Sequence, residues 1–331
     1  MNTWGHNIRL SIFGESHGAA VGITIDGLPP GLPLDFDFIN AEMARRAPGR
    51  SELATARLES DEVEILSGIF EGKATGTPLC AVIGNNNTRS GDYEPSLLRP
   101  GHADYAGLVK YRGFSDYRGG GHFSGRLTAP LVFAGAVAKL ALVRFGVKIE
   151  ANILKIAGEA DENAMRQAVL NAKEAGDSVG GVIECVAENV PAGLGEPFFG
   201  SVESELAALL FSIPAVKGVE FGDGFAMADM AGSEANDAFY MDGALIKTRT
   251  NHNGGINGGI TNGMPIVFRV AVKPTPSIAL EQNTVNAAAV QNAKIKVSGR
   301  HDPCIVYRAL PVVEAVGALV LLDAFGGAAA V

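Results

Sequence analysis

Two long segments of this chain are apolar around their whole circumference, which leaves few folds open to it. Residues 128–145 (TAPLVFAGAVAKLALVRF) and 311–325 (PVVEAVGALVLLDAF) have the character of helices without a continuous polar face, and such helices are buried. Lys139 interrupts the first segment, so it falls short of the roughly 18 uninterrupted apolar residues of a membrane-spanning helix. Both segments are therefore predicted to form a buried layer that other elements cover on two sides.

The strands predicted around this layer are half-buried. DEVEILSG (61–68) and VFRVAVK (267–273) alternate apolar and polar residues, a pattern typical of antiparallel strands with one face on the core. Two sheets of such strands would cover the helices from both sides. We therefore predict an α+β fold, a β-α-β sandwich of two mostly antiparallel sheets around a central helical layer.

The order of features along the chain occurs twice, which predicts an internal two-fold repeat. Each time a strand is followed by a proline- and glycine-containing turn, a helix, a glycine loop, a second strand and an apolar helix. The paired segments are LPPGLPL (28–34) with VPAGLGE (190–196), GIFEGKATGTP (68–78) with GINGGITNGMP (255–265), and RFG (144–146) with AFG (324–326). We predict a single domain, 1–331, built of two related halves, 1–157 and 158–331.

Charge and cysteine content limit the class of protein. The net charge of −9 argues against nucleic-acid binding, which needs a basic face. The three cysteines lie far apart without CxxC spacing, as expected of free thiols in a reducing compartment. The N-terminal segment MNTWGHNIRLSIFG has no apolar leader. We expect a cytoplasmic protein with no membrane partner.

Five of the six histidines lie in loops rich in glycine, proline or asparagine, and loops on a rigid scaffold carry function. The segments are GESHG (14–18), RPGHADY (99–105), GGGHFSG (119–125), NHNGG (251–255) and GRHDPC (299–304). Surface turns with ordinary ion pairs are the alternative interpretation. Arginine neighbours would repel a cation, and the histidines lack HxH or HxxxH spacing, so no metal site is expected.

Two features of these loops suit an anionic ligand. Three glycines before His122 allow backbone N–H groups to approach a phosphate, and a helix is predicted directly afterwards. Arginines gather in 40–72 and 89–126, and guanidinium groups match carboxylate and phosphate geometry. A small, multiply anionic ligand is therefore expected. Asp302 follows an arginine in GRHDPC and could act as a base.

Six motifs, in this order along the chain, resemble those of chorismate synthases. They are GESHGAAVGITIDGLP (14–29), RPGHADY (99–105), GDGF (222–225), NHNGGINGGITNG (251–263), KPTPSI (273–278) and GRHDPC (299–304). The resemblance implies a carbon–oxygen lyase of the shikimate pathway of aromatic amino acid biosynthesis. It would eliminate phosphate from 5-enolpyruvylshikimate 3-phosphate (EPSP) in an anti-1,4 sense and give chorismate. A degenerate relative that binds flavin or an anionic metabolite without turnover is the alternative.

The resemblance also implies a cofactor and partners. The family needs reduced FMN (FMNH2), although its net reaction is redox-neutral. NADPH is a candidate indirect reductant, with an external flavin reductase as a candidate partner, and members are typically homotetramers.

Site residues follow from the same resemblance. Four are implied in catalysis: His17 protonates the departing phosphate, His102 acts beside the flavin, Asp302 works with flavin N5 to remove the C6 hydrogen, and Ser16 supports proton transfer. The implied substrate-binding residues are Arg46, Arg50, Arg57, Arg126 and Arg300. The implied flavin-binding residues are His122, Phe123, Ser124, Pro214, Ala215, Gly258, Lys273, Pro274, Thr275, Pro276, Ser277 and Arg300.

The sequence departs from the family pattern at a few of these positions. His122 and Phe123 stand in HFSGR (122–126) where many members have Arg-Ser-Ser-Ala-Arg. Glu52 occupies a position that is often arginine. Individual ligand contacts are therefore expected to differ from those of other members.

Overall fold

Two antiparallel sheets form the frame of the molecule. The structure, a computed structural model, describes residues 2–49, 53, 60–86, 94–297 and 302–327. The five-stranded sheet has the order β1 (Thr3–Trp4), β2 (Arg9–Gly14), β3 (Ala20–Asp26), β7 (Leu79–Gly84), β4 (Val63–Ser67). The four-stranded sheet has the order β10 (Val216–Phe221), β15 (Ile266–Val272), β9 (Gly181–Glu188), β8 (Lys148–Ile156). Neighbouring strands in both sheets are antiparallel.

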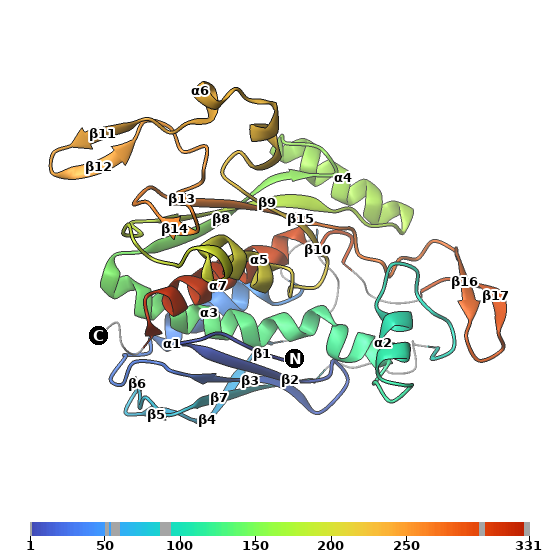
Figure 1. Ribbon diagram of the computed structural model, residues 1–331. Coiled ribbons are helices and arrows are strands. Elements are labelled where there is room, and N and C mark those ends of the chain that lie inside the picture. Colours follow the sequence, from blue (N-terminus) through green and yellow to red (C-terminus); the bar gives the residue numbers. More distant parts are fainter. Residues whose placement is uncertain (1, 50–52, 54–59, 87–93, 298–301, 328–331) are drawn as a thin grey trace.

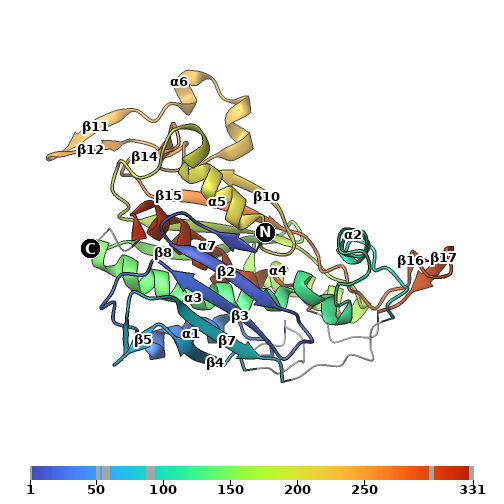
Figure 2. The ribbon, with the colours of Figure 1, turned by 60° about the horizontal axis from the view of Figure 1, so that its bottom comes forward.

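Four helices lie between the two sheets (Figure 1). They are α1 (Phe36–Arg46), α3 (Thr128–Leu142), α5 (Val202–Leu210) and α7 (Val306–Ala324). A further helix, α4 (Glu162–Ala175), covers the other face of the four-stranded sheet, as Figure 2 also shows. Mixed helices and antiparallel sheets confirm the predicted α+β class.

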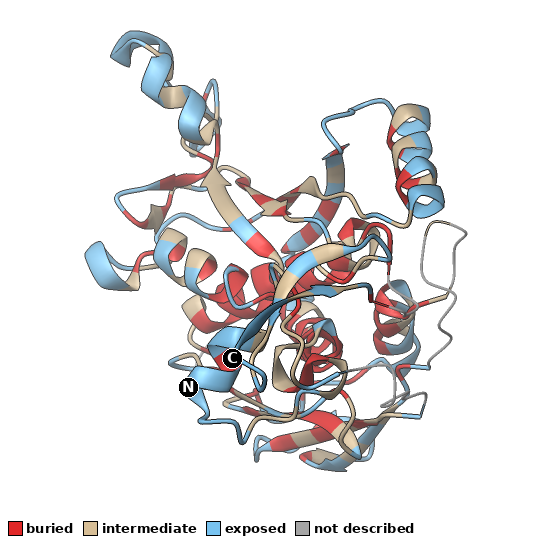
Figure 3. Cartoon of the chain, turned by 90° about the vertical axis from the view of Figure 1, so that its right-hand side faces the viewer, coloured by how far each residue is buried: buried red, intermediate tan, exposed pale blue. Residues whose placement is uncertain are grey.

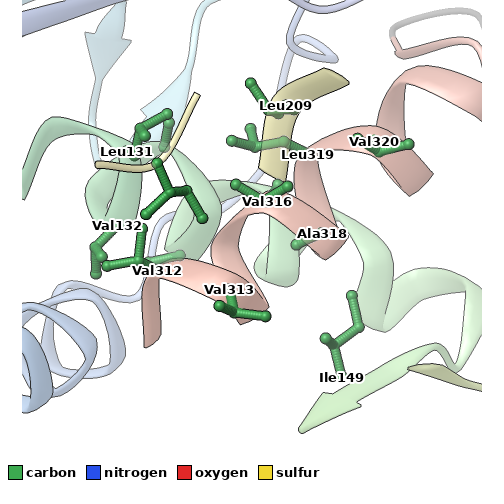
Figure 4. Packing of buried hydrophobic residues seen from close by; sticks show 14 of the residues in the cluster. Leu131, Val132, Ile149, Leu209, Val312, Val313, Val316, Ala318, Leu319 and Val320 are labelled. Carbon is green, nitrogen blue, oxygen red and sulfur yellow. The ribbon is translucent and has the colours of Figure 1, made fainter. Parts of the chain in front are cut away.

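The apolar helices α3 and α7 pack directly on each other at the centre of the core. A Cβ on Gly135 would collide with Ala315, so glycine allows the two backbones to approach closely here. Figure 4 shows Val312 of α7 beside Val132 of α3, and Val316 of α7 beside Leu209 of α5. Figure 3 shows the same layer as the most continuously buried part of the chain.

One segment, Arg118–Phe145, is long and apolar enough to cross a membrane by length and composition. However, 83% of its apolar window is buried inside the structure. It includes α3, which is covered by both sheets and by α7 rather than exposed to lipid. This burial is what a core helix of a folded domain shows.

The predicted helix 311–325 is longer than expected at its start. α7 begins at Val306, and Pro311 lies in its second turn. Proline removes one backbone N–H from the helix, and packing against α3 and the sheets outweighs this loss. The early start brings Arg308 into the first turn of the helix.

Short hairpins and turns surround the core. The hairpins are β5 (Ile69–Phe70) with β6 (Lys73–Ala74), β11 (Phe239–Asp242) with β12 (Leu245–Thr248), β13 (Ile256–Asn257) with β14 (Ile260–Thr261), and β16 (Gln282–Asn286) with β17 (Gln291–Ile295). The short helices are α2 (Asp104–Lys110) and α6 (Gly232–Ala235). α2 and β16–β17 lie at the same end of the molecule, whereas β11–β12 projects from another side (Figures 1 and 2).

Candidate active site

A cavity of about 550 Å³ opens at one end of the helical layer. This volume lies in the range of about 300–1,000 Å³ that is usual for small-molecule sites. Its wall comes from segments that are far apart in sequence: Ser16, the end of α1, residues 99–103, 119–128, 211–216 and 273–277, and the start of α7 with Asp302. The predicted loops therefore meet in one place.

The cavity wall is strongly cationic. Among the described residues that line it, five are arginine or lysine and one, Asp302, is acidic. Such a wall attracts anions, and the attraction strengthens where water is excluded. The cationic side chains are Arg46, Arg99, Arg126, Lys273 and Arg308.

A glycine loop carries two of the predicted catalytic histidines against its backbone. Gly119, Gly120 and Gly121 all have positive φ, at 59°, 84° and 53°, a region that glycine adopts without strain. A Cβ on Gly119 would collide with the His17 ring, and one on Gly120 would lie 3.1 Å from His102 Nε2. Both imidazoles thus pack where only glycine leaves room.

His102 is held by the partly buried carboxylate of Asp104. Its Nδ1–H donates to Asp104 Oδ1 at 2.6 Å, which directs Nε2 toward Gly120. Asp104 also accepts from Arg99 Nε at 2.8 Å and Nη2 at 2.7 Å. Burial would raise the pKa of Asp104, but hydrogen bonds from Arg99 and His102 outweigh it and hold this pKa well below its usual range. Asp104 is therefore a carboxylate at neutral pH.

Arg46 and Arg126 share a second buried carboxylate. Arg46 Nη1 donates to Asp61 Oδ2 at 2.5 Å, and Arg126 Nη1 donates to Asp61 Oδ1. Arg46 Nε also donates to Thr128 Oγ1 at 3.1 Å. Burial lowers the pKa of Arg46 to about 10 although the charge of Asp61 opposes this effect. The two predicted substrate-binding arginines are thus locked together.

Asp302 is paired with an arginine from the first turns of α7. Arg308 Nη1 donates to Asp302 Oδ2, and Arg308 Nε donates to the backbone carbonyl of Arg46 at 2.9 Å. Asp302 is only 8% exposed. Arg308 therefore connects the predicted base to the end of α1.

The loop after β15 forms the opposite part of the wall. Lys273 Nζ donates to the Gly101 carbonyl at 2.5 Å, and its backbone N–H donates to the Ala215 carbonyl at 2.9 Å. Arg99 Nη1 donates to Ser277 Oγ at 3.3 Å. Thr275 Oγ1 is buried with no hydrogen-bond partner in the described part of the chain. A buried hydroxyl without a partner is costly, which suits a ligand that hydrogen-bonds to it.

The segment that departs from the family pattern also lines the cavity. His122 Nδ1–H donates to the Gly14 carbonyl at 2.8 Å, which fixes the orientation of its ring. Ser124 Oγ accepts from the backbone N–H of Arg126 at 3.2 Å. The Phe123 ring packs against Gly107 of α2. These contacts hold the segment in place without the usual arginine.

Most of the predicted site residues meet in this cavity, but some do not. Its wall includes Ser16, Arg46, His102, His122, Phe123, Ser124, Arg126, Pro214, Ala215, Lys273, Thr275, Pro276, Ser277 and Asp302. His17 lies behind Gly119 rather than in the wall, and Pro274 does not line it either. Gly258 lies between β13 and β14 and is not part of the wall. Arg50, Arg57 and Arg300, with Glu52, fall outside the described residues.

Four residues that contact the predicted site residues in the structure were not identified from the sequence. Arg99 and Asp104 flank His102 in RPGHADY, so this motif already held the signal. Arg308 is a cation at the start of an apolar helix, which is a weaker signal. Asp61 lies in an ordinary alternating segment, and nothing in the neighbouring sequence marks it as a site residue. Its role depends on two arginines that only the fold brings to it.

Comparison with known proteins identifies the family. The sequence profile described as chorismate synthase matches residues 8–325. The chorismate synthase of Chitinophaga pinensis is 52% identical over 325 residues, which cover 98% of this chain and 96% of that protein. The chorismate synthase of Thermococcus gammatolerans is 49% identical over 342 residues, covering 96% of each chain. The chain belongs to the chorismate synthase family.

A solved chorismate synthase has the same fold. Its crystal structure matches with a TM-score of 0.74 and 31% sequence identity, covering 97% of this chain and 92% of that chain. Chorismate synthase is a carbon–oxygen lyase of the shikimate pathway, and this is the function that the family and the fold support for the chain. A degenerate binding protein is not favoured.

Proposed function

We propose that the cavity binds EPSP together with reduced FMN and releases phosphate to give chorismate. One observation carries this proposal: the glycine loop 119–121 holds His17 and His102 beside a cationic cavity that Asp302 also lines. Two acids, one base and several anion-binding side chains are what elimination of a phosphate requires.

The cavity residues fit a flavin mononucleotide. Lys273 and the glycine loop could hold its phosphate, and the unpaired Thr275 Oγ1 offers a hydrogen bond. His122, Phe123, Ser124 and the Pro214–Ala215 segment would contact the rest of the cofactor. When bound, reduced FMN supplies transient electron density that weakens the C–O bond to phosphate. Pro274 and Gly258 do not line the cavity, so flavin binding by these two residues stays a prediction.

The side chains of the chain itself handle charge and protons. Arg46 and Arg126 would orient the anionic groups of the substrate and stabilise the charge on the departing phosphate. His17 would give this phosphate a proton or hydrogen bond, assisted by Ser16. Asp302, with Arg308 fixing its carboxylate, would work with flavin N5 to remove the hydrogen from C6, and its Oδ would take that hydrogen up as a proton. Loss of one such anion contact costs on the order of 10²–10³ in rate. For Arg50, Arg57 and Arg300 the substrate-binding role stays a prediction.

The proposal is tested by anaerobic incubation with EPSP and dithionite-reduced FMN. We expect the absorbance of chorismate to rise and one phosphate to be released for each chorismate formed. Folded protein that binds FMN but forms no chorismate would overturn the proposal and favour the degenerate relative.

A second assay concerns the reductant. We expect no turnover in air with NADPH and oxidised FMN unless a flavin reductase is added, because an external enzyme is proposed to supply the reduced cofactor. Turnover without that enzyme would show that the chain reduces its own flavin.

An internal repeat is proposed for the single domain, and the strand order supports it. The order β2-β3-β7-β4 in one sheet matches β8-β9-β15-β10 in the other, and the hairpins β5–β6 and β13–β14 have equivalent pairing. Phe145 and Phe325, which end the two RFG and AFG segments, stack with ring centroids 4.4 Å apart. Because β8 starts at Lys148, we place the boundary of the halves near Gly146 rather than at 157.

A homotetramer is also proposed, and the projecting hairpin β11–β12 offers a surface for it. Phe239, Met241, Leu245 and Ile246 are between 62% and 69% exposed there. An isolated two-stranded hairpin is marginal in water, so a second copy would stabilise it. Sedimentation velocity of a Met241→Asp and Ile246→Asp double variant tests this: an unchanged tetramer would exclude the hairpin from the interface.

A further inference from the structure

The pair of arginines at the cavity wall depends on one carboxylate that never reaches the cavity. The Asp61 side chain is 1% exposed, and it is absent from the residues that line the wall. Arg46 and Arg126 both line that wall, and both side chains are 3% exposed. Asp61 therefore acts on a ligand only through these two side chains.

Two buried guanidinium groups with like charge repel each other unless an anion separates them. Asp61 offers one oxygen to each: Oδ2 to Arg46 and Oδ1 to Arg126. Burial would raise the pKa of Asp61, but the charges of Arg46 and Arg126 outweigh it and lower this pKa. The bridge is thus an ionised carboxylate between two cations, and the three groups together keep one positive charge.

The remaining bonds of each guanidinium fix its plane. Arg46 Nη2 donates to the Gly125 carbonyl at 3.2 Å. Arg126 Nε donates to Asn85 Oδ1 at 3.0 Å and Nη2 donates to the Gly84 carbonyl at 3.0 Å. Asp61 links these two sets of bonds, which involve the end of α1, the end of β7 and the 3-10 turn Gly125–Leu127 that precedes α3.

We propose that Asp61 is a positioning residue that holds Arg46 and Arg126 as one rigid clamp for an anionic group of the substrate. The inference rests on the proposed function, since it concerns how the same cavity grips its ligand. It assigns a role to a side chain that does not touch substrate, cofactor or any reacting atom.

The variant Asp61→Asn distinguishes a positioning role from a purely electrostatic role, because the two roles predict opposite changes in the affinity for EPSP. Loss of a negative charge next to a cationic cavity would, by charge alone, tighten anion binding. Asparagine, however, offers one acceptor and one donor instead of two acceptors, so one guanidinium faces an N–H group and is displaced. We expect EPSP to bind at least about tenfold more weakly.

Binding is measured by calorimetric titration of EPSP into the full-length protein with oxidised FMN. Glu184→Gln is the matched control: it removes a carboxylate that is paired with Arg269 at 2.8 Å on the four-stranded sheet, and it should leave the Kd of EPSP unchanged. Unchanged or tighter binding by Asp61→Asn would overturn the inference.

If Asp61→Asn alone folds poorly, the same substitution is tested in a protein that already carries Arg126→Met. In the Arg126→Met background the repulsion between the two guanidinium groups is absent, and the side-chain oxygen of the asparagine that replaces Asp61 can accept from Arg46. Adding Asp61→Asn in this background should therefore lower the affinity for EPSP by less than about threefold. The double variant should also melt at a higher temperature than Asp61→Asn alone. An equal cost in both backgrounds, or no gain in melting temperature, would contradict the clamp.

Failure of the proposed function has a different signature. It would appear as absent EPSP binding by the wild-type protein. The wild type, Asp61→Asn and Glu184→Gln are then compared with inorganic phosphate as the probe, and the clamp still predicts weaker binding for Asp61→Asn than for the other two.

Discussion

Arg45 and Arg46 are adjacent at the end of α1, yet they belong to two ionic clusters of opposite character. Arg45, whose side chain is partly exposed, joins the more buried Glu42, Glu314 and Lys139 in a quartet of two acids and two bases. Arg46 joins Asp61 and Arg126 in a group with two cations and one acid. The first group is neutral, whereas the second keeps a positive charge.

The contacts of the two groups explain this difference. Glu314 accepts from Arg45 Nη2 at 2.7 Å, from Lys139 Nζ at 2.6 Å and from the Ala151 backbone N–H at 3.0 Å. These bonds tie α1, α3, α7 and β8 together. A balanced cluster of this kind positions helices, while an unbalanced one at a cavity wall has charge left for a ligand.

The largest effect is expected from breaking the balanced quartet. Glu314→Ala removes a buried carboxylate, which leaves the largely buried Lys139 with Glu42 alone and the Ala151 N–H without its acceptor. We therefore expect a loss of about 3–5 kcal/mol in the free energy of unfolding. Urea denaturation measures this loss. Glu281→Ala is the control, because it breaks an exposed pair with Lys294 and should not shift the midpoint. An unchanged midpoint for Glu314→Ala would remove the structural role of the quartet.

Comparing the two neighbouring arginines sharpens the contrast. Arg46→Met should lower kcat/KM by about 10²–10³, or roughly 3–4 kcal/mol of transition-state stabilisation, because it removes an anion contact. Arg45→Met should instead lower the melting temperature and keep the activity of the folded fraction. Paired kinetics and calorimetry decide between them. Equal losses of activity in both variants would contradict the division of labour.

His102→Ala tests the cavity side of the comparison. It removes an imidazole that Asp104 holds beside the glycine loop, so turnover should fall about 10²-fold or more. Affinity for EPSP should stay close to that of the wild type, because the arginine clamp is untouched. Unchanged turnover would remove His102 from the proposed chemistry.

The smallest effect is the acid sensitivity of the quartet. Burial would raise the pKa of Glu314, but Arg45 and Lys139 outweigh it and lower this pKa below the ordinary value of 4.5. A carboxylate with a lowered pKa contributes stability above its unfolded pKa and loses it as the pH falls. We therefore expect Glu314→Gln to flatten the decline of the free energy of unfolding below about pH 4.5. A decline as steep as that of the wild type would contradict this.

The sequence predicted the parts of the site that lie in contiguous motifs. The glycine loop, RPGHADY and KPTPSI each carry their chemistry in neighbouring residues, and the structure brings all three to one cavity. Asp61 and Arg308 could not be found in this way, since their partners lie far away in the chain. The length of α7 was underestimated because Pro311 resembles a helix start, whereas tertiary packing extends the helix in front of it.

The fold class followed from local sequence patterns, whereas the positions of single site residues depended on tertiary structure. Alternating strands and apolar helices sufficed for the α+β class, since burial follows directly from their patterns. The sequence did not predict that Gly258 lies outside the cavity wall, because the spacing of a hairpin turn does not indicate which side of the molecule the turn occupies. His17 was assigned by its motif, but only the fold shows that it lies behind Gly119.

The glycine loop has a consequence for how this enzyme can change. Its consecutive residues Gly119 and Gly120 support different imidazoles, one belonging to each predicted proton donor. A substitution at either position alters the backbone of the other, so neither acid can be retuned alone by mutation in this loop. To change the environment of one histidine alone, a substitution must be made among the residues that contact the other face of its ring. Substitutions within the loop affect both histidines together.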